Sequence, residues 1–228
     1  MDRRGFMKQV AFLASGVVMS NGILRKPEKL FAKSTGAESF SLSLITDNPD
    51  TAIFSVEKLI KNSSLHTETL RFTEVELPGE QISDIVLVRN SKLINYRTST
   101  DHFSKNVARL AKELKMPEKL KNPVLLKFST SNSGQVARKI NVYHKNMLVA
   151  EYKIDDHVHE AQINGSKGDI VLSVQNSKVT IDAASCKHQT CVKMGHINRP
   201  GQNLVCIPNE LRVEIEGKNA LGLDSRLF

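Results

Sequence analysis

Four side chains that bind soft metal ions lie close together in the C-terminal part of the chain. They are Cys186, His188, Cys191 and Cys206, and the three cysteines, the only ones in the sequence, follow the spacing C-x4-C-x14-C. Thiolate sulfur and imidazole nitrogen are common protein ligands of zinc and of iron–sulfur clusters. An odd number of cysteines also leaves at least one that no disulfide within the chain can pair. The pattern therefore leaves structural, metal-binding and redox interpretations open.

The structural interpretation requires one disulfide. Either Cys186–Cys191 or Cys191–Cys206 would close a loop, and the remaining cysteine would be a buried thiol. Such a bond would stabilise a small domain by about 2–4 kcal/mol. The spacing does not choose between these two pairings.

The metal-binding interpretation has two forms. Cys186-x-His188 followed by Cys206-Ile207-Pro208-Asn209 resembles the two loops of Rieske iron–sulfur proteins, in which C-x-H and C-x2-H supply two thiolates and two imidazoles. Asn209 stands where the second histidine is required, and the Asn side chain is a poor ligand for iron. A single metal ion or a redox-active thiol site that uses Cys186, His188, Cys191 and Cys206 needs no second histidine.

Outside this group of residues the sequence offers little catalytic chemistry. No Ser/His/Asp or activated Cys/His arrangement is recognisable, so we name no catalytic residue. His157 and His159 would lie on one face of a strand, where a carboxylate beside them would complete a divalent metal site. The run 155–160 is more typical of a solvated connection.

The segments around the cysteines have the pattern of short strands and turns, with no helical period. Six strands are expected, at residues 137–143, 147–154, 169–174, 178–181, 203–207 and 211–215. A polar, turn-rich segment precedes them, and we expect residues 130–134 to be a linker. This part of the chain is therefore predicted to be an all-β, barrel-like domain over residues 135–220.

The preceding segment alternates strands with helices and is predicted to be a small α/β sandwich domain over residues 39–129. Strands are expected at residues 40–45, 69–77, 85–88, 93–96 and 124–128. Two helices are expected, one after the cap Asn48 and one after the cap at Thr100-Asp101. The segment contains no phosphate-binding loop and no G-x-S-x-G, so we assign it no chemistry and expect a partner-binding or spacer role. The fold class of the whole chain is thus α+β.

The first 32 residues have the layout of an export signal. Arg3 and Arg4 precede Phe6, Met7 and Lys8, and an apolar stretch follows. This head resembles the twin-arginine signature, although Met stands where Leu is usual. We expect a periplasmic or extracytoplasmic protein exported by the twin-arginine route. It would be anchored in a membrane only if the signal remains uncleaved.

Charge and composition exclude several classes of function. The chain carries 32 Lys+Arg against 24 Asp+Glu, and removing the expected signal lowers the net charge from +8 to +4. No basic cluster with interleaved aromatic residues occurs, so we do not expect nucleic-acid binding. The mixture of 40% hydrophobic and 25% charged residues indicates a globular chain rather than a disordered or polytopic membrane protein.

The cysteine segment also resembles the NusG domain II family. The resemblance rests on Cys186-x4-Cys191-Val192-Lys193-x-Gly195, on Pro200-Gly201-Gln202, and on Cys206-Ile207-Pro208-Asn209 preceded by a hydrophobic residue. It covers approximately residues 138–216 and implies a compact β-barrel. The family takes its name from a domain of a transcription factor, but most members similar to this chain are exported or membrane-tethered proteins that stand alone. We do not transfer a role in transcription.

These observations predict an exported, non-catalytic binding or accessory subunit of an extracytoplasmic assembly, with a protein partner at the cell envelope. The alternative is a redox or metal-binding electron-transfer protein that uses the loops of Cys186, His188, Cys191 and Cys206 to hold an iron–sulfur cluster or a single metal ion. The state of the cysteines distinguishes the two. Paired and inert cysteines favour the accessory role, whereas bound metal or a labile disulfide favours redox chemistry.

Overall fold

The N-terminal domain is built on a sheet whose central strand alternates small polar with large apolar side chains. The computed structural model describes residues 39–63, 70–130 and 135–219. Strand β1 (Phe40–Thr46) lies in the middle of a five-stranded antiparallel sheet of order β2-β7-β1-β4-β5. The other strands are β2 (Leu70–Glu76), β4 (Ile85–Arg89), β5 (Lys92–Ile94) and β7 (Val124–Thr130).

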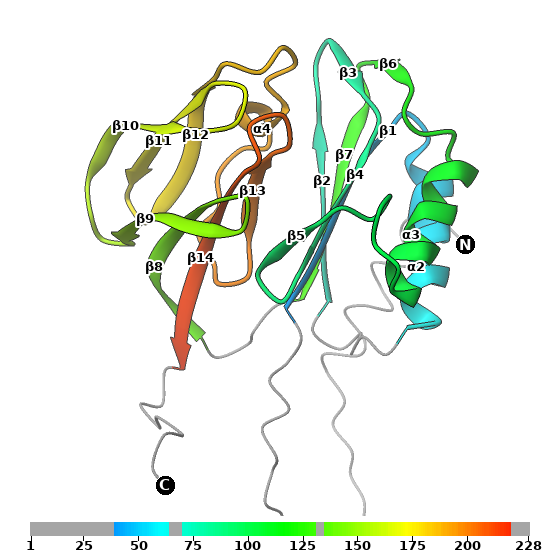
Figure 1. Cartoon of the computed structure of the whole chain (residues 1–228), viewed down its shortest axis with the longest axis horizontal. Coiled ribbons are helices and arrows are strands. Elements are labelled where there is room, and N and C mark those ends of the chain that lie inside the picture. The colour runs from blue at the N-terminus through cyan, green and yellow to red at the C-terminus, as the bar shows by residue number, and fades with distance from the viewer. Residues whose placement is uncertain (1–38, 64–69, 131–134, 220–228) are drawn as a thin grey trace, which may run out of the picture.

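Two helices cover one face of this sheet, as the sequence predicted. Helix α2 (Pro49–Lys61) follows Asn48 and helix α3 (His102–Glu113) follows Asp101, and each of these cap side chains accepts a hydrogen bond from a backbone N–H of the first turn. Phe40 of β1 packs edge-on against Phe103, with ring centroids 5.7 Å apart. Both helices lie on the side of the sheet away from the C-terminal domain (Figure 1).

The opposite face of the sheet is polar in two of its three rows. Because successive side chains of a strand point to opposite faces, the register places matching positions of β2, β7 and β1 side by side. The rows are Arg71, Ser129 and Ser41, then Thr73, Lys127 and Ser43, then Val75, Leu125 and Ile45. Ser41 and Ser43 are only 7% and 5% exposed, because the C-terminal domain covers this face.

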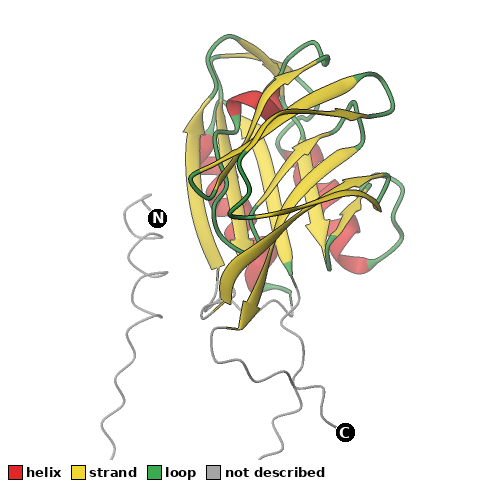
Figure 2. Ribbon diagram, turned by 90° about the vertical axis from the view of Figure 1, so that its left-hand side faces the viewer, coloured by secondary structure: helices red, strands yellow, loops and turns green. Residues whose placement is uncertain are grey.

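The C-terminal domain consists of two antiparallel sheets. The four-stranded sheet has the order β13-β14-β8-β9, and the three-stranded sheet has the order β10-β11-β12. Their strands are β8 (Gln135–His144), β9 (Met147–Lys153), β10 (Val158–Asn164), β11 (Asp169–Gln175), β12 (Lys178–Ala184), β13 (Asn203–Cys206) and β14 (Leu211–Asn219). Figure 2 shows these strands in front of the helices of the N-terminal domain.

The prediction of an all-β domain is confirmed, but its closure into a barrel is not found among the described residues. The four edge strands β9, β10, β12 and β13 do not pair between the two sheets. Among the described residues, one isolated bridge, between Val179 and Ile197, links β12 to the loop between Cys191 and Cys206. Buried side chains from both sheets, such as Ile140, Leu172 and Val213, instead form one core between them.

Four elements of the structure were not predicted. β10 occupies part of the run that we interpreted as a solvated connection, and Glu160 takes a positive φ of 56° where its register with β11 shifts. A four-residue helix, α4 (Thr190–Lys193), contains Cys191 and is too short to show a helical period in the sequence. Strands β3 (Glu80–Ile82) and β6 (Lys119–Lys121) form a separate two-stranded sheet.

The two domains share apolar core and hydrogen bonds. Ile45, Leu77 and Leu125 of the N-terminal domain belong to the buried cluster of the C-terminal domain. Thr190 donates from its hydroxyl to Gln81 Oε1 at 2.8 Å, and Lys193 donates from Nζ to the carbonyl of Pro78 at 2.9 Å. The polar sheet face is therefore an interface inside the molecule rather than a free surface.

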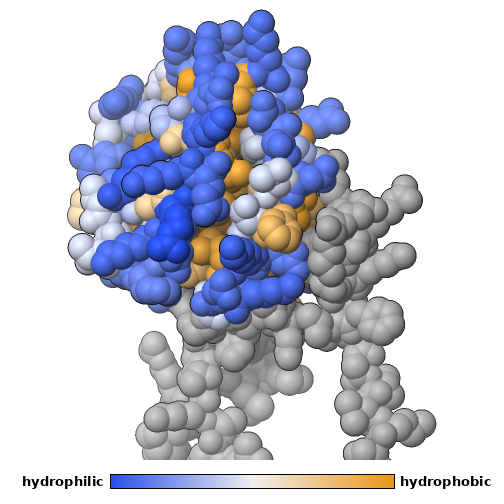
Figure 3. Space-filling model, turned by 90° about the vertical axis from the view of Figure 1, so that its right-hand side faces the viewer, coloured by the Kyte–Doolittle hydropathy of each residue, from blue (hydrophilic) through white to orange (hydrophobic). Residues whose placement is uncertain are grey.

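The expected export signal at residues 1–32 and most of the expected linker, residues 131–134, lie outside the described residues. Among the helices of the described ranges, none is long and apolar enough to cross a bilayer. The outward face over the helices is mostly hydrophilic, with hydrophobic residues in narrow strips between polar ones (Figure 3).

Candidate thiol site between the two domains

Three separate elements of the C-terminal domain bring the cysteines together. Cys186 lies just after β12, Cys191 lies in α4, and Cys206 is the last residue of β13. Their three Sγ atoms all lie within 4.8 Å of one another. The structure thus gathers residues from both ends of the C-x4-C-x14-C pattern into one cluster.

All three cysteines are free thiols in this structure, and no pair is joined by a disulfide. Cys191 and Cys206 are 1% and 2% exposed, whereas Cys186 is half-buried. The cluster lines a cavity of about 480 Å³ between the domains, whose opposite wall includes Ile45, Val86 and Leu125. Since every pair is within the same short range, the geometry does not single out either of the two predicted pairings.

Hydrogen bonds make the three thiols unequal. The thiol of Cys191 and the backbone N–H of Asn209 both donate to Cys206 Sγ, which lowers the pKa of Cys206 to about 6 despite its burial. The same bond to Cys206 raises the pKa of Cys191, and burial adds to that rise. Burial is also the main reason why the pKa of Cys186 is raised. The pKa of Cys206 is therefore the lowest of the three, so Cys206 is the thiol that loses its proton first.

Asn209 supports the loop that carries Cys206. Its side chain is fully buried and donates from Nδ2 to the carbonyl of Asp169 at 3.2 Å and to Ser185 Oγ at 3.4 Å. The backbone of Asn209 also packs closely against Gly165, where a Cβ would lie 2.5 Å from the carbonyl oxygen of Asn209. These bonds position the backbone of the loop, so Asn209 acts as a structural residue rather than as a metal ligand.

The predicted histidine ligand does not join the cysteines. Nδ1 of His188 lies 3.3 Å from the carbonyl oxygen of Glu80, and the described side chains place no histidine or carboxylate within the group of three sulfurs. His188 nevertheless lines the same cavity. His196 lines a different one. The arrangement of two thiolates and two imidazoles that a Rieske cluster requires is therefore absent from the described residues.

Three thiols at this separation could hold a soft metal ion. A zinc–thiolate bond is about 2.3 Å, so three sulfurs around one ion would lie roughly 4 Å apart, within the range seen here. Thiolate ligands select zinc and Cu(I) over hard cations. Cys206, whose pKa is lowered, is the cysteine that gives up its proton to a metal ion most easily.

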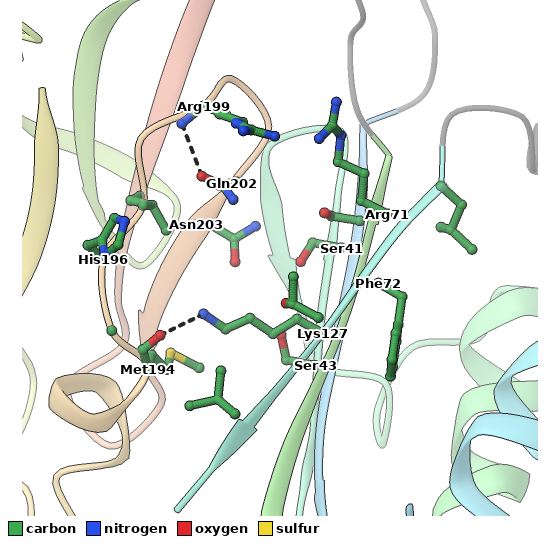
Figure 4. A pocket seen from close by; sticks show the side chains of 16 residues that line it. Ser41, Ser43, Arg71, Phe72, Lys127, Met194, His196, Arg199, Gln202 and Asn203 are labelled. Atoms are coloured by element: carbon green, nitrogen blue, oxygen red, sulfur yellow. Dashed lines mark hydrogen bonds between the residues drawn. The ribbon is translucent and has the colours of Figure 1, made fainter. Parts of the chain in front are cut away.

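A second cavity, of about 540 Å³, adjoins the first along the interface and shares Ser43 and Met194 with it (Figure 4). Lys127 lies at the centre of the cavity wall that the N-terminal sheet provides. The sequence did not predict a role for this residue. The available signal was a charged side chain at an inward position of β7, whose other inward neighbours are Leu125 and Ser129.

Comparison with known proteins identifies the region that carries the cysteines. Residues 123–219 match the family model described as NusG domain II. This range begins upstream of the resemblance seen in the sequence and includes β7. None of the curated proteins matches the chain.

Solved structures show similarity to part of the chain. A DUF1312 family protein from Ruminococcus gnavus is 25% identical, with a TM-score of 0.31 over 35% of this chain and 99% of its own. The crystal structure of the Lin0431 protein from Listeria innocua is 22% identical, with a TM-score of 0.32 over 35% of this chain and 95% of its own. The NMR structure of Lin0431 covers 43% of this chain and 89% of its own, at 20% identity and a TM-score of 0.32.

Proposed function

We propose, from the premise that residues 123–219 form a NusG domain II, that this chain is an exported metal-binding protein that holds one soft metal ion at its three cysteines. The observation that carries the proposal is the convergence of Cys186, Cys191 and Cys206 from three elements, with all three sulfurs within 4.8 Å. A purely structural role would need only two of them to meet.

Burial and charge around the sulfurs support a metal ion. Cys191 and Cys206 are enclosed, so water competes poorly for the ion, while half-buried Cys186 faces the cavity through which the ion would enter. Lys167 and Lys187 line that cavity and would offset the negative charge of three thiolates. Three protein ligands would leave one coordination position of a tetrahedral ion unfilled. His188 lines the same cavity as the three cysteines.

Export by the twin-arginine route agrees with this function, since that route carries folded proteins and would allow metal to be loaded before translocation. Inert cysteines without metal would instead support the accessory role that the sequence predicts, with a protein partner at the cell envelope. No catalytic residue is required.

A second candidate function is thiol redox chemistry, and the lowered pKa of Cys206 favours it. A thiolate at Cys206 beside Cys191 is an attacking nucleophile next to a second thiol. Half-buried Cys186 is the sulfur that a partner's disulfide can reach, so it would form the mixed disulfide and release one partner thiolate. The Cys206 thiolate would then attack Cys186 Sγ, which closes a Cys186–Cys206 disulfide and releases the second partner thiolate.

The experiment is metal analysis and a thiol count on protein purified from its export route, with and without reductant. We expect about one zinc or copper ion per chain, and roughly a tenfold or greater loss of affinity in Cys206→Ser, because one of three ligands is removed. Ile207→Ser, an exposed neighbour of Cys206, is the matched control and should keep the metal. A disulfide that reductant opens, without metal, would select the redox function. Three unreactive thiols without metal would reject both.

A further inference from the structure

The second interdomain cavity has the size and shape of a small-molecule site. Its volume of about 540 Å³ lies within the usual range of ligand pockets, roughly 300–1,000 Å³. The polar face of β1, β2 and β7 forms one wall, and the loop from Met194 to Asn203 forms the other (Figure 4). Neither the thiol site nor the proposed metal uses this space.

The charges that line the cavity are all of one sign. Arg71 and Lys127 come from the N-terminal sheet, and Arg199 comes from the facing loop, with His196 beside it. None of the sixteen described residues that line the cavity is an Asp or a Glu. In Figure 4 the two arginines lie at the same end of the cavity, from opposite domains, while Lys127 lies deeper. Such a set of groups attracts an anion.

Lys127 provides the strongest sign that a ligand is expected here. Its Nζ donates to the carbonyl oxygen of Met194 at 3.0 Å, and the described part of the chain supplies no carboxylate partner for it. An ammonium group has three donors, so two remain for another acceptor. Burial lowers the pKa of Lys127 to about 8, which shows that the protein does not compensate its charge.

The rest of the lining is suited to an apolar body. Val75, Met194 and Ile197 face the same space. Val75 lies in the row of the sheet next to Lys127 and Ser43. An inorganic anion would leave these apolar side chains without a contact. A ligand with an acidic group and an apolar part would satisfy both kinds of surface.

We propose that this cavity binds a small organic anion, whose acidic group is held by Lys127 with the support of Arg71 and Arg199, and whose apolar part lies against Val75, Met194 and Ile197. The site is independent of the proposed metal function, because no cysteine lines it.

The test uses 8-anilinonaphthalene-1-sulfonate as the probe, since it joins a sulfonate to an apolar body and fluoresces on entering an apolar site. Fluorescence titration of the full chain at pH 7 should show saturable binding of one probe molecule. Lys127→Met should weaken binding roughly tenfold, which corresponds to the loss of one charged hydrogen bond. Lys105→Met is the matched control, because this exposed lysine lies on α3, behind the opposite face of the sheet. It should leave the affinity unchanged.

A second variant excludes misfolding as the cause. Arg71 and Arg199 are exposed at the end of the cavity, so Arg71→Gln/Arg199→Gln should fold normally and still weaken binding by several-fold. In the natural chain the affinity should fall as the pH rises through about 8, where Lys127 loses its proton. The other ionisable groups facing the cavity are Arg71, Arg199 and His196. Lys127→Arg, whose charge persists, should remove that fall.

Two results would overturn the proposal. Unchanged probe affinity in both Lys127→Met and Arg71→Gln/Arg199→Gln would show that the probe binds elsewhere on the surface. Displacement of the probe by inorganic phosphate as effectively as by benzoate or phenyl phosphate would show that no apolar part is recognised. Displacement by the organic anions alone is the expected result.

Discussion

The two faces of the N-terminal sheet are both covered, but the helices enclose their face more completely than the C-terminal domain encloses the other, where Arg71 and Thr73 stay exposed. The two faces also differ in chemistry. Toward the helices, β1 and β7 present Phe40, Leu42, Leu126 and Phe128, all of them almost fully enclosed. Toward the C-terminal domain the same strands present small hydroxyl side chains and Lys127. The face toward the helices stabilises the fold because it buries apolar area. The polar face contributes less stabilisation than apolar residues at the same positions would provide. The difference teaches that the domain interface retains polar groups and cavities that packing alone would not select.

The largest expected effect comes from the helix-covered face. Phe128→Ala removes a ring that is fully enclosed and 5.0 Å from the ring of Phe72. We expect a loss of about 3–5 kcal/mol in the free energy of unfolding, because a large cavity is created in a rigid core. Urea denaturation followed by circular dichroism measures it. A loss below 1 kcal/mol would contradict the view that this face is the stabilising one.

A smaller loss is expected where the covering domain supports the thiol site. Asn209→Ala removes the hydrogen bonds to Asp169 and Ser185 from a fully buried position, at about 1–3 kcal/mol. The measurement is the urea midpoint, together with the metal content. Asn146, whose side chain bonds to the backbone of Leu93 at an exposed position, offers a control, since Asn146→Ala should cost less. Equal losses in the two variants would contradict the conclusion that Asn209 stabilises the loop that carries Cys206.

Lys127, the neighbour of Phe128 in sequence, should give an effect of opposite sign. Lys127→Met removes a charge whose burial destabilises the fold, and we expect a gain of about 1–2 kcal/mol at pH 7 after the lost bond to Met194 is subtracted. The native pKa of about 8 lies below the unfolded value, so the unfolded chain binds more protons between them and the natural protein gains stability as the pH rises through this range. The advantage of the variant should therefore be complete below pH 8 and shrink toward pH 10. Thermal melts at both pH values test this, and a constant advantage would contradict it.

The smallest effect is expected at Ser43, which lines both interdomain cavities. Ser43→Ala should change the free energy of unfolding by less than about 0.5 kcal/mol, since the hydroxyl faces a cavity rather than packed atoms. Its neighbour Leu44, fully enclosed on the other face, serves as the comparison. Leu44→Ala should be destabilising by about 2–5 kcal/mol in the same denaturation experiment. Similar losses in the free energy of unfolding for the two variants would show that the two faces contribute equally to stability.

Local patterns in the sequence were sufficient for most of the secondary structure. The alternation in residues 40–45 and the caps Asn48 and Asp101 predicted β1, α2 and α3, because these signals act over a few residues. The predicted strands 85–88 and 93–96 are confirmed on either side of a turn at Asn90 and Ser91, both of which have positive φ. β10 was missed because a bulge at Glu160 breaks its alternation. The spacing of the cysteines identified the residues of the thiol site but not their arrangement.

The sequence by itself determined the α+β class, the family of the C-terminal domain and the set of cysteines, since periodicity, turns and motif spacing are properties of neighbouring residues. Only the tertiary structure decided that Cys186, Cys191 and Cys206 meet at one point. It also decided that the imidazole of His188 contacts the carbonyl oxygen of Glu80 instead of joining the three sulfurs. It alone placed Lys127 opposite Arg199 in a cavity between two domains. These relations depend on how two sheets and two domains pack, and contacts between distant residues leave no local pattern in the chain.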